Sequence, residues 1–239
     1  MAQRTVSQKR FFPNVDRISR KLSAVYGDWD HFNRANPLEE LLFIICSTQT
    51  NEGLYSSTFA ALRQRYPRFT ALLSASAEEI GMTIAHGGLS NQKAKLITLI
   101  LKRLVERFGR PTLAPLCGMA DEECEQFLIS LPGVGKKTAR CVEMYSLGRH
   151  VFPVDSNCWR ICRRIGWVRP TRPDKSCSPR DMDRVQAGIP PKLRFKLHVN
   201  MVSLGRQVCT PRNPRCPECP IRLYCRRIGL SSMAAIAAS

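Results

Sequence analysis

Apolar residues recur along this chain of 239 residues at the three- and four-residue spacing of amphipathic helices. Helix-capping signals agree with that spacing. Asn36-Pro37-Leu38-Glu39 is a capping sequence that opens the apolar run Leu41–Ile45, and Ser76-Ala77-Glu78-Glu79 is a capping box. The sequence shows no convincing alternation of apolar and polar residues of the kind that a half-buried strand requires. The pattern predicts an all-α fold.

Each predicted helix has an apolar face and a recognisable start or stop signal. We expect the main ones over residues 52–65, 91–108, 121–130, 136–147, 156–165 and 191–207. Ser90 is expected to cap the second of them. The segment 169–179, rich in Pro, Arg and Ser, predicts a loop, and the small uncharged tail 229–239 is expected to be disordered.

Composition is ordinary for a globular protein, with 44% hydrophobic and 23% charged residues, which argues against a disordered or fibrous chain. The net charge is not ordinary: 37 Lys and Arg against 19 Asp and Glu give +18. Residues 1–130 carry 16 basic and 13 acidic side chains, or +3, and residues 131–239 carry 21 and 6, or +15. A basic excess of this size predicts a polyanionic partner, most often nucleic acid and sometimes an anionic membrane surface, facing the second half.

No run of 18 apolar residues is present, and the basic N-terminus lacks the apolar segment of a secretion signal. We therefore expect no membrane partner and a cytoplasmic protein, associated with the nucleoid if it is bacterial. The 11 cysteines are odd in number and follow no export signal. They predict a reducing compartment, with some cysteines as metal ligands and the rest as small buried apolar residues.

Four cysteines are spaced C-x6-C-x2-C-x5-C within 17 residues, with prolines between them. Because those prolines prevent a regular helix or strand, four unrelated buried cysteines are a poor explanation. Four thiolates in one short loop are a ligand set for tetrahedral zinc or for a [4Fe–4S] cluster, and the spacing alone leaves both open. These candidate ligands are Cys209, Cys216, Cys219 and Cys225. The other seven cysteines show no ligand spacing, and packing is the expected role even for the i,i+4 pair Cys158 and Cys162.

The sequence Leu131-Pro132-Gly133-Val134-Gly135 lies between two predicted helices. Its glycines permit a tight turn whose backbone N–H groups face outward at the start of the next helix, a geometry that suits a phosphate of any nucleotide. Glycines occur at many helix corners, but together with the basic second half these favour contact with a nucleic-acid backbone through Gly133, Val134 and Gly135. Lys136, which follows, is expected to be a solvated phosphate contact.

Lys137 occupies the same first helical turn beside another lysine. The helix dipole and the neighbouring cation should depress its pKa, as an amine needs in order to act as a nucleophile near neutral pH. Asp155 stands immediately before the predicted helix 156–165. It can be the N-cap of that helix, or a carboxylate that stabilises a developing cation or moves protons. The two roles are compatible, and the local sequence does not choose between them.

Together these motifs resemble the endonuclease III family of helix-hairpin-helix base-excision DNA glycosylases, over about residues 30–228. The segment LPGVGKKTA at 131–139 resembles the family's hairpin, whose catalytic lysine falls on Lys137, and Asp155, 18 residues on, resembles its catalytic aspartate. The cysteine spacing resembles the family's iron–sulfur motif and so favours [4Fe–4S] over zinc. Segments 47–50 and 88–94 resemble two loops that enter DNA, with Gln49 filling the gap left by a flipped nucleotide and Leu89 wedged beside it.

The resemblance implies a six-helix domain at about 33–149, with the helix-hairpin-helix at about 121–147. Beside it would lie a cluster domain made of 1–32 and 150–228, with a DNA-binding groove between the two. The implied enzyme is a monomer that acts on double-stranded DNA containing a damaged, modified or abasic nucleotide. Lys137 would displace the base, and the resulting Schiff base would allow β-elimination, so that one protein is both glycosylase and AP lyase.

One departure bears on the substrate. After the aspartate, endonuclease III has Thr-His, whereas this chain has Ser156-Asn157. Segments 152–157 and 164–168 also resemble the plant 5-methylcytosine DNA glycosylases. Three functions follow: excision of oxidised or otherwise damaged pyrimidines, which we favour; the same chemistry on 5-methylcytosine or another modified base; or a non-catalytic, metal-containing DNA-binding module.

Overall fold

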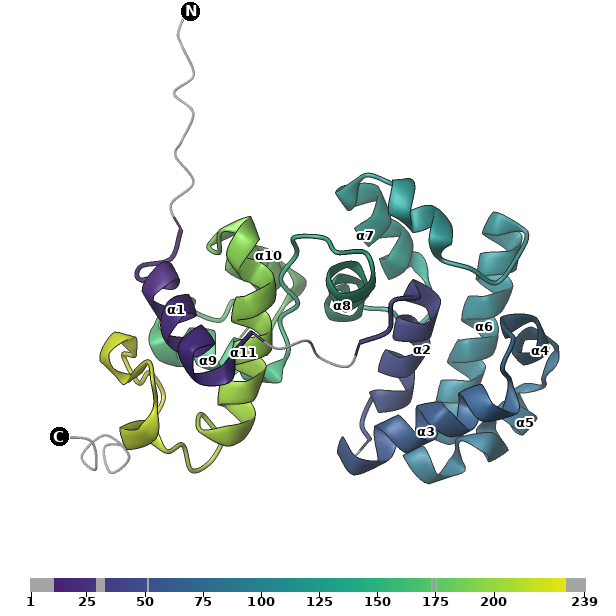
Figure 1. Ribbon diagram of the computed structural model, residues 1–239, viewed down its shortest axis with the longest axis horizontal. Helices are drawn as coiled ribbons and strands as arrows, with labels where there is room; N and C mark the ends of the chain where they lie inside the picture. Colours follow the sequence, from purple (N-terminus) through teal and green to yellow (C-terminus); the bar gives the residue numbers. More distant parts are fainter. Residues whose placement is uncertain (1–10, 29–32, 51, 173, 175, 231–239) are drawn as a thin grey trace, which may run out of the picture. The chain divides into compact units, whose positions relative to one another are not determined.

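The computed structural model describes residues 11–28, 33–50, 52–172, 174 and 176–230 (Figure 1). Throughout these residues the regular structure is helical, without a β-strand, so the all-α prediction is confirmed. The chain divides into two compact units, one of residues 33–149 and one that combines 1–32 with 150–239. We call them the central unit and the terminal unit. Across the described ranges no helix combines the length and the apolar character that crossing a bilayer requires.

The central unit is built around α2, which is buried on most of its surface because α3, α6 and α8 all pack against it. Its continuous apolar run is therefore typical of a helix buried in the core, and not of an amphipathic surface helix. The structure adds the six-residue helix α4 to the six helices that the resemblance implies. The helices of this unit are α2 (Pro37–Ser47), α3 (Glu52–Arg65), α4 (Phe69–Ser74), α5 (Ala77–Thr83), α6 (Ser90–Phe108), α7 (Asp121–Ser130) and α8 (Lys136–Ser146), with 3₁₀ turns η1 (Ala85–Gly87) and η2 (Ala114–Gly118).

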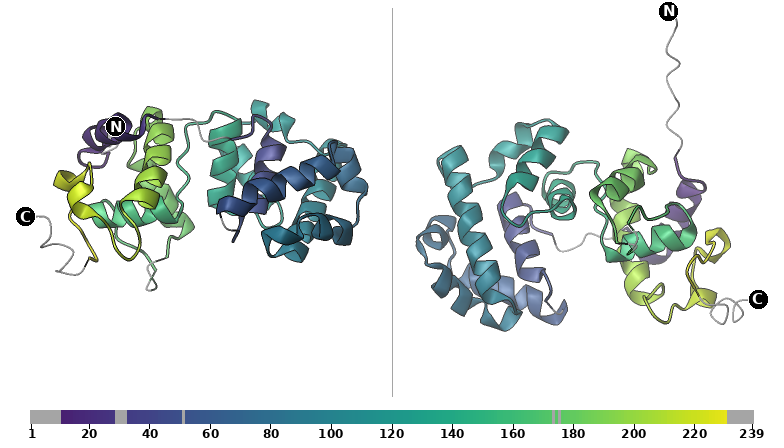
Figure 2. Two further views of the ribbon diagram at one scale, coloured as in Figure 1. Left: turned by 60° about the horizontal axis from the view of Figure 1, so that its bottom comes forward. Right: turned by 180° about the vertical axis from the view of Figure 1, so that it is seen from behind.

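The terminal unit has a separate core, in which Phe152 is fully buried and Cys158 and Cys162 pack as apolar residues. Its central helix is α11, which packs against α9 and against α1 from the other end of the chain (Figures 1 and 2). The helices of this unit are α1 (Val15–Tyr26), α9 (Ser156–Ile165), α10 (Pro179–Ala187) and α11 (Arg194–Gln207), with 3₁₀ turns η3 (Pro191–Leu193), η4 (Cys216–Glu218) and η5 (Arg222–Tyr224).

Two of the predicted caps are confirmed. The Asn36 side chain accepts from the backbone N–H of Leu38 at 2.9 Å, and Ser76 forms a reciprocal capping box with Glu79. The predicted cap at Ser90 is wrong. Helix α6 begins at Ser90 itself, and the N-cap is Leu89, which is left-handed and makes no side-chain cap hydrogen bond.

The predicted boundaries need smaller corrections. Helix α8 ends at Ser146, and residues 191–193 form a 3₁₀ turn before α11 begins. Three helices were missed, the short α4 of the central unit and two of the terminal unit. Helix α1 follows Asn14, which makes no side-chain cap bond, and α10 starts at the end of the predicted loop with a capping box of Ser178 and Asp181. Of the predicted disordered tail, residues 231–239 lie outside the described residues.

Of the two glycines between α7 and α8, Gly133 is required by the conformation of the turn and Gly135 is not. Val134 donates its N–H to the Leu131 carbonyl at 3.1 Å, which closes the turn. Gly133 has a φ of +72°, and a Cβ there would lie 2.8 Å from a Leu96 methyl carbon, so a larger residue is strained and displaces Leu96. Gly135 has an ordinary φ of −92° and open space where a Cβ would point. Only Gly133 is required by the fold.

We therefore expect Gly133→Ala to lower the free energy of unfolding by about 1–3 kcal/mol, from left-handed strain and the clash with Leu96. Gly135→Ala should change it by less, about 0.5 kcal/mol, because the loss of a glycine N-cap is partly offset by reduced chain entropy. Urea unfolding followed by circular dichroism measures both. Equal destabilisation by the two substitutions would contradict this account of the turn.

Candidate functional site

Lys137 is half-buried in the first turn of α8. The N-cap of this helix, Gly135, supplies no side-chain hydrogen bond, so no side chain satisfies the first-turn N–H groups from that position. Glu40 of α2, in the same unit, is only 1% exposed and accepts the Arg34 N–H at 2.8 Å. Burial raises the pKa of Glu40, while the positive charges of Arg34 and Lys137 act in the opposite direction. The central unit thus places a buried carboxyl group within the electrostatic field of Lys137.

Sequence reasoning missed Glu40. Its only local signal is an acidic residue directly after the capping Glu39, at the start of an apolar run. That pattern is equally typical of a second acid in the first turn of a helix. Only the packing of α2 against α8 shows that Glu40 is a buried carboxyl group near Lys137 and not merely a second acid in a first helical turn. A single sequence does not reveal that packing.

Lys136 is not the solvated cation that the sequence predicted. Its ammonium lies 3.2 Å from a carboxylate oxygen of Glu125 on α7, and only 17% of its side chain is exposed. The other oxygen of Glu125 accepts from Arg140 at 2.8 Å. This ion-pair network joins the two helices of the hairpin. Val134 is also buried, and its N–H is already bonded to the Leu131 carbonyl oxygen; contact of this hairpin with phosphate stays a prediction.

Gln49 and Leu89 share an unusual backbone conformation. Both side chains are exposed, and both residues are left-handed, with φ of +50° and +49°. For residues other than glycine this costs roughly 1–2 kcal/mol each, so the surrounding structure must hold them. Their loops lie together in the central unit, where the Thr50 hydroxyl is 2.6 Å from the Gly87 carbonyl oxygen. The structure therefore joins two segments that the sequence places forty residues apart.

Asp155 is the N-cap of α9, as one of its two interpretations predicted. One carboxylate oxygen accepts the Cys158 N–H at 2.7 Å, and the other accepts from the Asn157 amide at 3.1 Å. Arg160 in turn donates to the Asn157 side-chain oxygen at 2.7 Å. Burial opposes ionisation of Asp155, but the nearby charge of His198 and these hydrogen bonds outweigh it and lower the pKa of Asp155. Asp155 is a fixed, ionised carboxylate.

The residue that departs from the endonuclease III pattern thus has a structural role. Asn157 orients Asp155 on one side and is itself held by Arg160 on the other. It also packs closely on Gly205 of α11, where a Cβ would lie 2.6 Å from that of Asn157. Lys137 belongs to the central unit and Asp155 to the terminal unit, so each is supported by its own neighbours.

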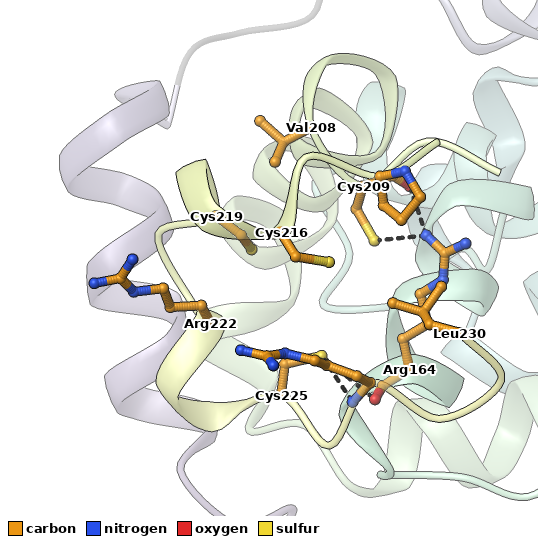
Figure 3. Close-up of a pocket in the computed structure, with 10 residues that line it drawn as sticks. Arg164, Val208, Cys209, Cys216, Cys219, Arg222, Cys225 and Leu230 are labelled. Atoms are coloured by element: carbon orange, nitrogen blue, oxygen red, sulfur yellow. Dashed lines mark hydrogen bonds between the residues drawn. The ribbon is translucent and has the colours of Figure 1, made fainter. Parts of the chain in front are cut away.

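The four candidate metal ligands line one small pocket in the terminal unit (Figure 3). Within the described part of the chain, no three His, Cys, Asp or Glu side chains are grouped to hold a single metal ion. The cysteine side chains line a common pocket. A set of four thiols around a common pocket suits a cluster whose metal atoms each take one ligand. These cysteines are Cys209, Cys216, Cys219 and Cys225.

Arg164 holds the first part of this cysteine loop in place, and sequence reasoning missed it. It is 7% exposed and donates to the Cys209 sulfur at 3.1 Å. It also donates to the carbonyl oxygens of Thr210 and Pro211, at 2.7 and 2.9 Å. Arginine suits this position because its planar fork can satisfy several acceptors at once. Among so many arginines, nothing in the sequence distinguishes this one.

Comparison with known proteins identifies the class. Residues 42–185 match the family described as "HhH-GPD superfamily base excision DNA repair protein". Since the match covers more than half of the chain, the protein belongs to this superfamily, and the family resemblance seen in the sequence is confirmed.

Individual relatives agree with this class. The candidate DNA glycosylase At3g47830 of Arabidopsis thaliana is 34% identical over 173 residues, which are 72% of this chain and 57% of that protein. Endonuclease III of Thermotoga maritima is 29% identical over 190 residues, 80% of this chain and 83% of that protein. DNA glycosylase/AP lyase ROS1 of Arabidopsis thaliana is 30% identical over 169 residues, 65% of this chain. The chain spans little more than half of the first relative and only 12% of ROS1.

Solved structures agree on the fold. A non-covalent endonuclease III–DNA complex superimposes with a TM-score of 0.73 at 23% identity, covering 90% of this chain and 94% of that one. A trapped endonuclease III–DNA covalent intermediate gives a TM-score of 0.71 at 25% identity, covering 89% and 92%. The all-helical endonuclease III type of architecture is therefore shared.

The cap at Asp155 makes a stability prediction. Asp155→Ala should lower the free energy of unfolding by about 1–2 kcal/mol, because the Cys158 N–H loses its acceptor. Asp155→Asn should lose less at neutral pH, because asparagine keeps the cap. Since folding lowers the pKa of Asp155 from 3.8, the stability from its charge is present at neutral pH and lost as the pH falls through the folded-state pKa. Urea unfolding at several pH values tests this; an Asn variant as unstable as the Ala variant would contradict it.

Proposed function

We propose that this protein is a bifunctional DNA glycosylase and AP lyase that removes damaged pyrimidines from double-stranded DNA. The observation that carries the proposal is Lys137 at the start of α8, directly after a glycine hairpin, in a chain of the HhH-GPD superfamily. An amine at this position can attack a sugar carbon as a nucleophile. The trapped covalent endonuclease III–DNA intermediate, which has the same fold, also supports covalent chemistry.

Access to the base comes first. A base stacked in duplex DNA is out of reach of any side chain, so the nucleotide must rotate out, at a cost of a few kcal/mol that damage reduces. The exposed side chains of Gln49 and Leu89, each on a left-handed residue, are suited to enter the duplex. Gln49 would fill the space of the absent base, and Leu89 would hold apart the neighbouring pair.

The chemistry then follows from two groups. The Lys137 amine attacks C1′ as the bond from C1′ to the base breaks, and the base leaves with that electron pair and takes up a proton. The ionised carboxylate of Asp155 stabilises the positive charge that develops on the sugar. Opening of the sugar ring leaves a protonated Schiff base between Lys137 and C1′. Loss of a C2′ proton then expels the 3′ phosphate, which breaks the strand, and water releases the lysine.

The hairpin would hold the DNA backbone during these steps. The open space at Gly135 lets a phosphate approach the N–H groups at the positive end of α8, and the same geometry accepts any sequence. Gly133 and the internal hydrogen bond of the Val134 N–H shape the turn, and Lys136 adds positive charge. The basic excess of residues 131–239 gives the backbone contact a broad electrostatic basis.

We propose a [4Fe–4S] cluster as the cofactor of the cysteine pocket. Its four candidate ligands surround a common space, and Arg164 already fixes the loop around Cys209. When bound, the cluster would supply a structural cross-link that fixes a loop too rich in proline to form a helix or strand. The arginines that follow, among them Arg222 and Arg227, would then offer positive charge to DNA.

A second substrate class has its own support. Asn157 stands where endonuclease III has histidine and contacts Asp155 directly. ROS1, which is named a DNA glycosylase/AP lyase, is 30% identical over 65% of this chain. Excision of 5-methylcytosine or another modified base by the same mechanism is therefore the alternative. The non-catalytic module is disfavoured because a binding domain has no need of both Lys137 and an oriented Asp155.

Borohydride trapping on abasic duplex DNA tests the lyase chemistry. The wild type should form a covalent adduct, and Lys137→Ala should form none, because no amine remains to make the Schiff base. Lys136→Ala is the matched control and should still be trapped. Asp155→Asn should slow base excision by roughly 100-fold. A wild type that forms no adduct, or a Lys137→Ala variant that is trapped as well as the wild type, would rule out this mechanism.

The excised base is then identified by parallel reactions on matched duplexes that contain thymine glycol or 5-methylcytosine. Faster release from the thymine glycol duplex supports the favoured substrate class. Faster release from the 5-methylcytosine duplex replaces it with the alternative.

The cofactor has a separate test. Protein purified without oxygen should contain iron and sulfide in equal amounts and absorb visible light, and Cys219→Ser should lose both properties. Cys117→Ser, which changes an exposed cysteine outside the pocket, should keep them. Zinc in a colourless wild-type protein would exclude the cluster and return the site to the tetrahedral alternative.

A further inference from the structure

Lys93, in the first turn of α6, is a buried lysine with three neutral partners. Only 3% of the residue is exposed. Its ammonium donates to the Cys46 carbonyl oxygen at 2.8 Å, to the Gly87 carbonyl oxygen at 2.9 Å, and to the Thr50 hydroxyl. Burial lowers the pKa of Lys93. A buried charge is costly unless hydrogen bonds compensate it, so these contacts need a structural reason.

The helix that carries Lys93 does not supply that reason. A cation in the first turn of α6 opposes the helix dipole. By contrast, Cys46 lies at the end of α2, where carbonyl groups lack partners within the helix and a cation is favourable. The position of Lys93 is therefore explained by what it binds in other elements.

What it binds are two loops. Cys46 and Thr50 flank the loop that carries Gln49, and Gly87 lies two residues before Leu89. Thr50 also contacts the Gly87 carbonyl oxygen directly, at 2.6 Å. One ammonium thus holds both loops through three oxygens, and a hydroxyl that it contacts forms a second link between them.

The loops themselves need such support. Gln49 and Leu89 are both left-handed without being glycine, and each lies within two residues of a partner of Lys93. Gly87 is packed so closely on Thr58 that a Cβ would lie 2.5 Å from the Thr58 hydroxyl oxygen. The second loop is therefore held from two sides, by α3 and by Lys93.

We propose that Lys93 is a positioning residue that locks the loops of Gln49 and Leu89 at one separation, so that both side chains enter the duplex as a unit. This rests on the proposed function, because it assigns both loops to DNA. Lys93 itself touches no reacting atom. Its loss should impair rotation of the nucleotide out of the duplex and leave the attack by Lys137 intact.

The test compares Lys93→Met with Lys95→Met, which removes the same charge from an exposed position on the same helix. The first readout is 2-aminopurine fluorescence beside a non-cleavable tetrahydrofuran abasic site in duplex DNA. The second is borohydride trapping on a single-stranded abasic oligonucleotide, where no duplex must be opened. We expect Lys93→Met to reduce the fluorescence change at least tenfold with trapping within twofold of the wild type, and Lys95→Met to leave both within twofold.

A double-mutant cycle separates positioning from a general structural role. In a Gln49→Ala/Leu89→Ala background, Lys93→Met should reduce excision from duplex DNA by no more than twofold further, since the side chains that it positions are absent. An equal fold loss in both backgrounds would overturn the proposal. So would a Lys93→Met protein with wild-type fluorescence change.

Folding and the proposed function are controlled separately. If Lys93→Met does not fold by circular dichroism, Thr50→Val, which removes only the hydroxyl link, replaces it and should show the same selective loss in smaller degree; wild-type behaviour of that variant would overturn the proposal. A wild type without adduct or excision rejects the proposed enzyme. The fluorescence comparison with Lys95→Met then still decides whether Lys93 positions the loops.

Discussion

The start of α8 is the constraint on which the central unit depends. An N-terminus without a capping side chain, with two consecutive lysines in its first turn, is electrostatically unfavourable by itself. The neighbouring helices compensate for it: Glu125 of α7 pairs with Lys136 and Arg140, and the buried Glu40 of α2 lies within the electrostatic field of Lys137. These carboxylates offset the positive charge at the start of α8, which follows a turn that needs a left-handed residue at Gly133.

In the terminal unit, the Asp155 carboxylate and the irregular cysteine loop must both be held in fixed positions. Helix α9 does most of this. At its start, the Cys158 N–H and the Asn157 amide hold the Asp155 carboxylate. In its last turn, Arg164 donates hydrogen bonds to the cysteine loop. One helix therefore orients a carboxylate at one end and a candidate metal site at the other, and a change in α9 should affect both.

Much of the site follows from local sequence because its signals are local. A glycine that must be left-handed, a carboxylate before a helix and four closely spaced cysteines are each read within a few residues, and the structure bears out the turn and the cap. Ser90 failed as a cap because the left-handed Leu89 ends the loop before it, a conformation that leucine seldom adopts and propensity does not predict. The expectation of a solvated Lys136 was wrong because its partner Glu125 lies on the preceding helix; its contact with phosphate stays a prediction.

The sequence by itself determined the all-helical fold, most helix boundaries, the family and the set of candidate site residues, since periodicity, caps and ligand spacing act over short stretches of chain. Only the tertiary structure decided how those residues are supported. Glu40 in the field of Lys137, Arg164 on the cysteine loop, and Lys93 between the loops of Gln49 and Leu89 all act on residues distant in sequence. Such contacts depend on how helices pack, and a buried lysine or arginine is recognised only when its partners are in place.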